Sequence, residues 1–267
     1  MKNIFLISIL ILIAFSSCRK EDATKVINGL PRMEEALVAL KGDKNGAIRI
    51  SAQKTFDMQS VSGQKNLWEV WGKFWSDDNV TQKYGDLSID SFMLAPKISG
   101  VYQSEAMLNN PDLGPLFGKT VDFTVNRGDM ERTVLLQSSL YVPADITVSA
   151  PVKTTANQVL ARTTTVTWNP DVNNTKGIYI LIEFDPEDDD NAAFNNGVRT
   201  YQYNLIQTND DGAFTLSAND FSDMPAGAKV MLWVGRGNYN MIDGAEGLNK
   251  YALYSYTIAF DNFILGQ

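Results

Sequence analysis

Short runs in which apolar and polar residues alternate extend along most of the chain, and they predict strands more often than helices. Residues 119–126 and 130–141 form such runs on either side of a glycine-containing turn, which predicts a hairpin. Residues 87–94 alternate in part and are expected to be strand. Residues 31–42 instead carry the start and stop signals of a helix: proline at the first position, acidic residues in the first turn, and lysine followed by glycine at the end. Residues 66–75 fit one helical face and, less fully, a strand, so both assignments stay open.

The second half of the chain consists of strand-like runs rich in β-branched and aromatic residues. These runs are 146–150, 163–169, 178–184, 199–207, 228–235 and 251–260. Several short strands with no helical pattern between them predict an antiparallel sandwich. Pro143 ends the preceding run, because proline is unfavourable inside a central strand, and we place a domain boundary near Asp145. We therefore expect a mainly β protein, with a β-rich N-terminal domain carrying one or two short helices (31–145) and a β-sandwich (146–267).

Three segments of the second half resemble strands of fibronectin type III and related immunoglobulin-like modules. Residues 165–170, Thr-Val-Thr-Trp-Asn-Pro, are similar to the second strand, which carries a tryptophan. Residues 179–184 resemble the third strand, and residues 221–227 followed by 230–234 resemble the corner leading into the sixth. The tyrosine usual after that corner is replaced here by Val230 or Met231, and residues 185–197 are a longer insertion than a plain module needs. The resemblance implies an immunoglobulin-like sandwich with Trp168 in its core.

The N-terminus has the three parts of a secretory signal. Lys2 is followed by an apolar run at residues 4–15 and by small residues up to Cys18. A retained membrane helix is excluded by length, because twelve residues span roughly 18 Å against about 30 Å of hydrocarbon. Cleavage after Ser17 by the general signal peptidase is the remaining alternative.

The end of this signal resembles a lipobox, although Phe15 stands where that family usually has an aliphatic residue. The resemblance implies that residues 1–17 are removed and that Cys18 is acylated, with palmitate-type chains as the covalent lipid. Residues 18–30 would then be the lipidated cysteine and its tether. Lys20, Glu21 and Asp22 resemble an export tag that directs lipoproteins to the outer face of the outer membrane in one Gram-negative phylum. An ordinary charged tether facing the periplasm is the alternative.

Charge and missing residue types narrow the possible functions. The chain has 23 basic and 31 acidic residues, so a nucleic-acid partner is not expected. Cys18 is the only cysteine, which excludes an intramolecular disulfide. Histidine is absent, which excludes Ser-His-Asp and Cys-His catalysis and imidazole metal sites. We therefore expect no enzyme; the alternative is a carboxylate-dependent carbohydrate-active enzyme of the cell envelope, with two acids about 5–10 Å apart.

Two groups of residues are candidate binding sites. Five carboxylates lie close together in one insertion and could hold calcium, although their spacing favours a solvated acidic loop: Asp185, Glu187, Asp188, Asp189 and Asp190. Six aromatic residues could include a sugar-stacking platform or could simply fill the core: Trp68, Trp71, Trp75, Trp233, Tyr239 and Tyr251. Trp75 and Tyr239 are the expected exposed members, Tyr239 because residues 235–240 are expected to form a loop.

These patterns together predict a lipoprotein anchored to the outer membrane and facing the cell exterior. Its role is expected to be non-catalytic, either binding a glycan or protein ligand or serving as a structural partner in the envelope. No cofactor is expected apart from the lipid on Cys18 and, as the one candidate ion, calcium.

Overall fold

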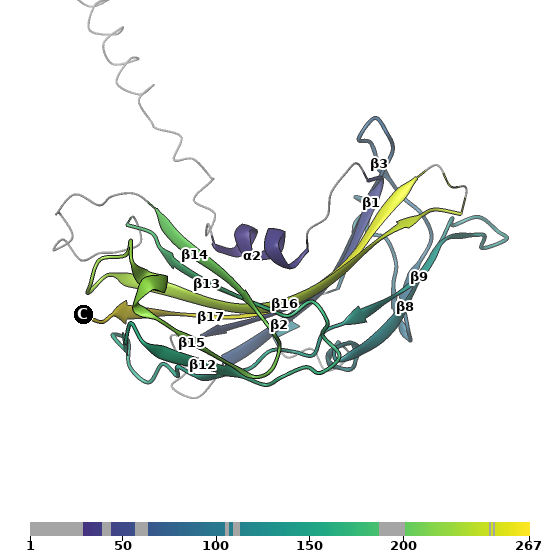
Figure 1. Ribbon diagram of the computed structural model, residues 1–267. Helices are drawn as coiled ribbons and strands as arrows, with labels where there is room; N and C mark the ends of the chain where they lie inside the picture. Colours follow the sequence, from purple (N-terminus) through teal and green to yellow (C-terminus); the bar gives the residue numbers. More distant parts are fainter. Residues whose placement is uncertain are drawn as a thin grey trace, which may run out of the picture.

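The computed structural model describes residues 29–38, 44–56, 64–104, 107–108, 113–186, 201–245, 247 and 249–267. The predicted signal, Cys18, the export tag and four of the five acidic residues of the insertion (Glu187, Asp188, Asp189 and Asp190) lie outside these ranges. The described part is built mainly from antiparallel β-sheets, as Figure 1 shows, which confirms the predicted fold class. Its helix is far too short and polar to cross a bilayer, so no membrane-spanning helix occurs among the described residues.

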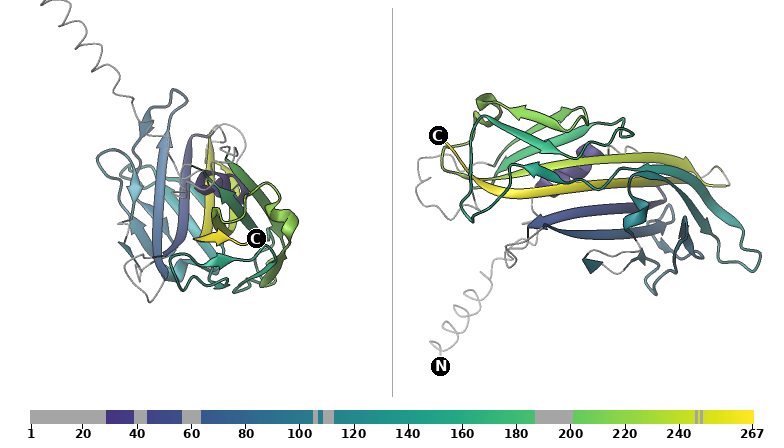
Figure 2. Two further views of the ribbon diagram at one scale, coloured as in Figure 1. Left: turned by 90° about the vertical axis from the view of Figure 1, so that its left-hand side faces the viewer. Right: turned by 90° about the horizontal axis from the view of Figure 1, so that it is seen from below.

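A ten-stranded sheet runs the length of the molecule. Its main path is β14 (Gln202–Thr208), β13 (Ile178–Phe184), β16 (Lys229–Asp243), β17 (Lys250–Leu265), β1 (Gly46–Phe56), β2 (Gln64–Trp75) and β3 (Thr81–Gln82). Three short strands complete it: β11 (Val159–Leu160) pairs with β17, while β6 (Tyr102–Gln103) and β7 (Met107–Leu108) pair with β2. The pairs β1–β17 and β11–β17 are parallel. The long strands β16 and β17 join the two ends of the molecule (Figures 1 and 2).

Two smaller sheets form further layers. One consists of β10 (Val148–Ala150), β12 (Thr164–Trp168) and β15 (Ala213–Leu216), and the other of β5 (Phe92–Leu94), β4 (Leu87–Ile89), β8 (Lys119–Asn126) and β9 (Val134–Val142). Two short 3-10 helices lie in the described connections, η1 (Gly114–Leu116) and η3 (Ala218–Phe221). The hairpin predicted around residues 126–129 is confirmed as β8 and β9.

The β10-β12-β15 sheet and the β14-β13-β16-β17 part of the long sheet enclose one core. Val166, Ile180, Phe221 and Val234 are fully buried in it, and Trp168 is 3% exposed, which confirms its predicted core position. A strand in which apolar and polar residues alternate suits such an arrangement, because successive side chains point to opposite faces, one toward the core and one toward solvent. Three strands facing four in this order form an immunoglobulin-like β-sandwich, as predicted.

A second core lies between β5-β4-β8-β9 and the other half of the long sheet. It contains Ile48, Val70, Phe123 and Leu253. Most residues of the second core precede the predicted boundary near Asp145 along the chain, and the residues of the first core follow it. However, β16 and β17 contribute to both cores, so strands from either side of Asp145 share one sheet.

Helix α2 (Gly29–Leu37) covers the opposite, concave face of the long sheet (Figure 1), and it is the helix predicted at residues 31–42. Its apolar residues Met33 and Leu37 pack on Trp233 and Ile258. Close approach is possible because β16 has glycines beneath the helix. A Cβ at Gly237 would lie 2.8 Å from the Cβ of Leu37.

One open assignment is decided and one prediction about local structure is wrong. Residues 66–75 are strand, because β2 is paired with β1 from Gln64 to Phe74, and Val70 and Phe74 fill a core while Trp71 and Lys73 face away. The helix-like spacing arose because both faces of this strand carry large apolar residues. Residues 235–240 are not a loop but the middle of β16, since every one of them is paired with β17.

Candidate functional site

A row of five side chains crosses the long sheet on the face that carries α2. The strand register places Tyr239 beside Tyr254, Tyr254 beside Arg49, Arg49 beside Trp71, and Trp71 beside Gln103. Neighbouring strands lie about 4.8 Å apart, so the row is roughly 19 Å long. All five residues are partly exposed. We call these five residues the aromatic row.

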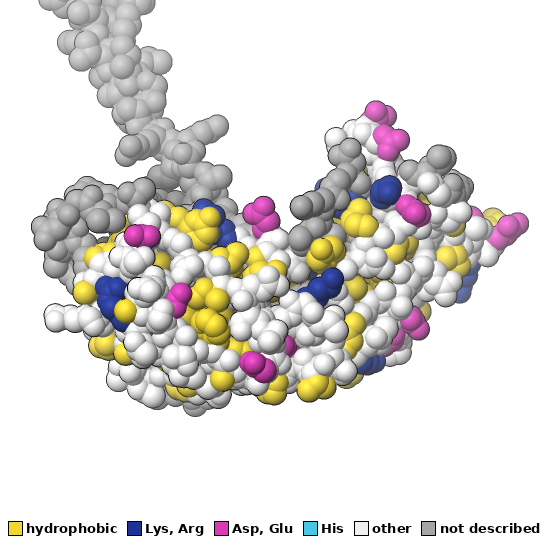
Figure 3. Space-filling model, in the orientation of Figure 1, with side chains coloured by type: hydrophobic (Ala, Val, Ile, Leu, Met, Phe, Trp, Pro, Cys, Tyr) yellow, Lys and Arg dark blue, Asp and Glu magenta, His cyan; other side chains and the backbone are white. Residues whose placement is uncertain are grey.

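The row lies beside α2 on the concave side of the sheet. In Figure 3 the upper outline of the molecule is hollowed between its two ends, and α2 occupies this side in Figure 1. Tyr239 and Tyr254 contact the apolar cluster under the helix. The guanidinium carbon of Arg49 lies 5.8 Å from the ring centroid of Trp71, and Lys176 Nζ lies 5.4 Å from that of Tyr239. The row therefore places the Arg49 cation between the rings of Tyr254 and Trp71, and a second cation, Lys176, lies near the ring of Tyr239.

A chain of polar contacts holds the polar members of the row in place. Gln103 Nε2 donates to Glu69 Oε1 at 2.8 Å, and Arg49 Nη2 donates to Glu69 Oε2 at 2.5 Å. Arg49 Nη1 also lies 3.6 Å from Glu34 Oε1 of α2, and the Tyr256 hydroxyl donates to the same oxygen. Burial lowers the pKa of Arg49, but Tyr256, Glu69 and the other neighbouring acidic groups outweigh it and raise the pKa overall. Arg49 is thus a permanently charged, oriented donor.

The two aromatic residues singled out from the sequence lie on this face in different ways. Tyr239 belongs to the row, although it sits within a strand and not in a loop. Trp75 is partly exposed at the end of β2, four residues beyond Trp71 and on the same face, which places it roughly 14 Å along the strand. Two further members of that set, Trp233 and Tyr251, are buried.

Trp68, the remaining member, points to the other face and packs on Phe117 with ring centroids 6.0 Å apart. Tyr254 and Arg49 were not predicted as site residues. Nothing in the sequence places either residue beside Trp71, because the neighbours come from β17, β1 and β2 and only the register aligns them.

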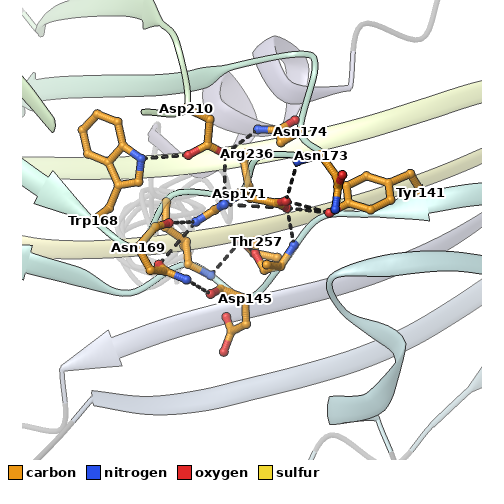
Figure 4. Close-up of polar contacts among 12 residues, drawn as sticks. Tyr141, Asp145, Trp168, Asn169, Asp171, Asn173, Asn174, Asp210, Arg236 and Thr257 are labelled. Carbon is orange, nitrogen blue, oxygen red and sulfur yellow. Dashed lines mark hydrogen bonds and ion pairs between the residues drawn. The ribbon is translucent and has the colours of Figure 1, made fainter. Parts of the chain in front are cut away.

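A second polar group lies deep in the molecule where the two cores meet (Figure 4). Arg236 of β16 is fully buried and points away from α2. Its Nη1 donates to Asp210 Oδ2 at 2.9 Å and lies 3.7 Å from Asp171 Oδ2, and its Nη2 donates to the Asn169 carbonyl at 2.6 Å. Asp210 also accepts hydrogen bonds from Trp168 Nε1 at 2.9 Å and Asn174 Nδ2 at 2.8 Å.

The same cluster continues into the connection between β9 and β10. Asp171 accepts hydrogen bonds from the Tyr141 hydroxyl at 2.7 Å and from the Ala144 amide at 2.8 Å. Burial and the bond to Asp171 raise the pKa of Tyr141, so this hydroxyl stays protonated as a donor. Nearby, Lys54 Nζ lies 3.3 Å from Asp145 Oδ2; burial lowers the pKa of Lys54 and raises that of Asp145. These interior contacts join the two cores, and we assign the cluster a structural role.

The predicted calcium site stays a prediction, because four of its five residues lie outside the described ranges. Asp185 is the one acidic residue of that insertion within the described ranges, and it is partly buried after the end of β13. Among the described residues, no group of three or more acidic or cysteine side chains is arranged to hold a metal ion.

Comparisons with known proteins add little to this picture. No protein-family model matches the chain, and no curated protein matches it. Among solved structures, the FN1–FN3 domains of chicken CNTN1 align with 12% sequence identity and a TM-score of 0.19. That alignment covers 79% of this chain and 66% of the other, just under two thirds of its length.

Proposed function

We propose that this protein is a lipid-anchored, non-catalytic binding protein of the cell envelope that holds a glycan on the aromatic row. The observation that carries the proposal is the placement of Tyr254 and Trp71 on either side of Arg49, all partly exposed on one concave face. A flat ring offers an apolar face of the size of a pyranose, and a fixed cation beside it offers donors to hydroxyl groups.

The polar contacts of the row support this function by lowering the cost of binding. Arg49, Glu69 and Gln103 are already joined to one another by hydrogen bonds, so few rotamers need to be fixed when a ligand arrives. Arg49 lies between two carboxylates, Glu34 and Glu69, so the site does not present a net positive charge at this point. This balance favours a neutral sugar over a uronic acid or a sulfated sugar.

The proposed anchor fits the position of the row. Acylation of Cys18 would place the membrane eleven residues before the start of α2, a distance of at most about 40 Å for an extended chain. Several acyl chains would hold the protein there stably. With Lys20, Glu21 and Asp22 acting as an export tag, the aromatic row would face the cell exterior, where polysaccharides are encountered.

A glycan array on the chain from residue 19 to 267 tests the binding proposal. Any glycan that binds is then titrated against Trp71→Ala and Tyr254→Ala, and each loss of a stacking ring should weaken binding by about 0.5–1.5 kcal/mol, roughly 2- to 13-fold. Tyr203→Ala removes an exposed ring far along the sheet from the row and is the matched control. An array without binding, or equal losses in all three variants, would refute the proposal.

The anchor is tested separately by metabolic labelling with a fatty acid. Cys18→Ser should abolish labelling and leave the precursor uncleaved. A Cys18→Ser protein that is still cleaved and released would show that residues 1–17 are an ordinary secretory signal.

A further inference from the structure

The ten-stranded sheet ends on one side in a long strand that no other described strand covers. Within the described part of the chain, β14 has β13 as its only neighbour. Its sequence, Gln-Tyr-Asn-Leu-Ile-Gln-Thr, contains no charge, proline or glycine. Natural proteins protect exposed edges with charges, proline, bulges or very short strands, because an edge offers unpaired N–H and C=O groups to another strand.

The other edges of the described sheets are protected in these ways. The edge strands β3, β5, β10 and β15 have two to four residues each. The longer edge strand β9 is covered, since the Ala245 amide donates to the Leu135 carbonyl at 3.1 Å and Asn238 Nδ2 donates to the Tyr141 carbonyl at 3.0 Å. The seven-residue β14 is the exception.

The edge strand also exposes apolar side chains at alternate positions. Tyr203 is 48% exposed and Leu205 is 38% exposed, both on the face of α2. Side chains on both faces contact the strand: the guanidinium carbon of Arg32 lies 3.9 Å from the Tyr203 ring centroid on this face. On the other face, Asn204 Nδ2 donates to the Asp220 carbonyl at 3.1 Å. The edge is therefore preformed for pairing.

We infer that β14 pairs antiparallel with β14 of a second copy of this chain, about a twofold axis at Leu205. In this register Leu205 faces its own counterpart, Tyr203 faces Gln207 of the partner subunit, and Gln202 faces Thr208 of the partner subunit. The two ten-stranded sheets become continuous. Twofold contacts of this kind, in which both subunits use the same patch, are the commonest in soluble oligomers.

Charge is the reason for choosing a second copy as the occupant. The chain carries a net charge of −8, so two copies repel each other over most of their surfaces. The strand β14 is uncharged, and pairing it with itself therefore brings no like charges opposite each other. A strongly charged partner would gain no ion pair with the residues of this strand.

The contact is expected to be weak in dilute solution. A single pair of seven-residue strands buries less than the roughly 800 Å² per partner of a standard interface. Copies held on one membrane would meet at a much higher effective concentration. The test must therefore trap a weak contact, and it does not depend on whether the protein binds a glycan.

Disulfide trapping suits this chain, because residues 19–267 contain no cysteine and include every described element. In the proposed register the two Leu205 Cα atoms lie about 4.5–5.5 Å apart, within the range of a disulfide. Leu205→Cys should form a covalent dimer under mild oxidation, seen on a non-reducing gel. Val134→Cys is the matched control, because Val134 is 37% exposed at the start of the edge strand β9.

Two further variants test the register. Tyr203→Cys or Gln207→Cys alone places the paired thiols four residues apart along the strand, roughly 14 Å, so neither alone should form a dimer quickly. A mixture of the two variants should form the mixed dimer at a rate near that of Leu205→Cys. If Leu205→Cys forms a dimer no faster than Val134→Cys, the proposed pairing is wrong. If Tyr203→Cys alone forms a dimer as fast as Leu205→Cys, the register is overturned.

Discussion

The substitution Asp210→Asn should destabilise the protein strongly, although it changes few atoms. The Asp210 side chain is 2% exposed and accepts hydrogen bonds from Trp168, Asn174 and Arg236. The variant loses the charge, and its amide must turn an N–H group toward one of three donors. Arg236 keeps a carboxylate only at 3.7 Å, from Asp171. Removing one partner of a buried ion pair costs about 3–5 kcal/mol.

Thermal and urea unfolding measure this loss. For a chain of this size each kcal/mol corresponds to about 2–4 °C, so the midpoint should fall by roughly 6–20 °C. Asp211→Asn is the matched control: the adjacent residue is exposed, and the same change there should stay within about 0.5 kcal/mol. A loss below about 1 kcal/mol in Asp210→Asn, or an equal loss in the control, would show that the buried cluster does not join the two cores.

Two further predictions concern the packing of α2 on β16 and the stability of the protein at alkaline pH. Gly237→Ala should lower the free energy of unfolding by about 1–3 kcal/mol, measured in urea, because the new Cβ would lie 3.0 Å from the Leu37 backbone oxygen. In Gly235→Ala the new Cβ would lie 2.8 Å from the flexible end of Met33, so adding Met33→Ala should relieve the steric clash of Gly235→Ala but not that of Gly237→Ala. Burial raises the pKa of Tyr102 to about 12, so its contribution to stability is complete below pH 10 and is lost as the pH rises to 12. The difference in unfolding free energy between the wild type and Tyr102→Phe should therefore shrink over that range by up to about 2–3 kcal/mol, and a constant difference would contradict the assignment.

Strand positions could be predicted from the sequence where one face of a strand is buried and the other is exposed to solvent. Residues 163–169 became β12 and residues 178–184 became β13, with Val166 and Ile180 in the core. The same reasoning left β2 open between helix and strand, and it was wrong in the middle of β16. In β2 both faces carry large apolar residues, so the period of two is hidden. In β16 the glycines that suggested a loop are there because α2 approaches the strand closely.

The residues of the candidate site were even harder to predict from local sequence patterns than the strands. Trp71 and Tyr239 were recognised as aromatic residues that could bind a sugar, but their neighbours Tyr254 and Arg49 were not. Five strands contribute to the row, from two parts of the chain that are far apart in the sequence: β1, β2 and β6 in the first, β16 and β17 in the second. The parallel pairing of β1 with β17 brings the two parts together. Pairing of this kind depends on packing over the whole sheet, which local periodicity does not record.

The sequence by itself determined the β class, the position of most strands, the core position of Trp168, the exclusion of histidine chemistry and of disulfides, and the resemblance of the N-terminus to a lipoprotein signal. These properties depend on residue type or on spacing within a few residues. Only the tertiary structure decided that β16 and β17 join two cores, that Arg236 lies buried between them, and which aromatic side chains share a face. Each of these depends on contacts between residues distant in sequence, and their free energy is set by burial and register in the folded chain.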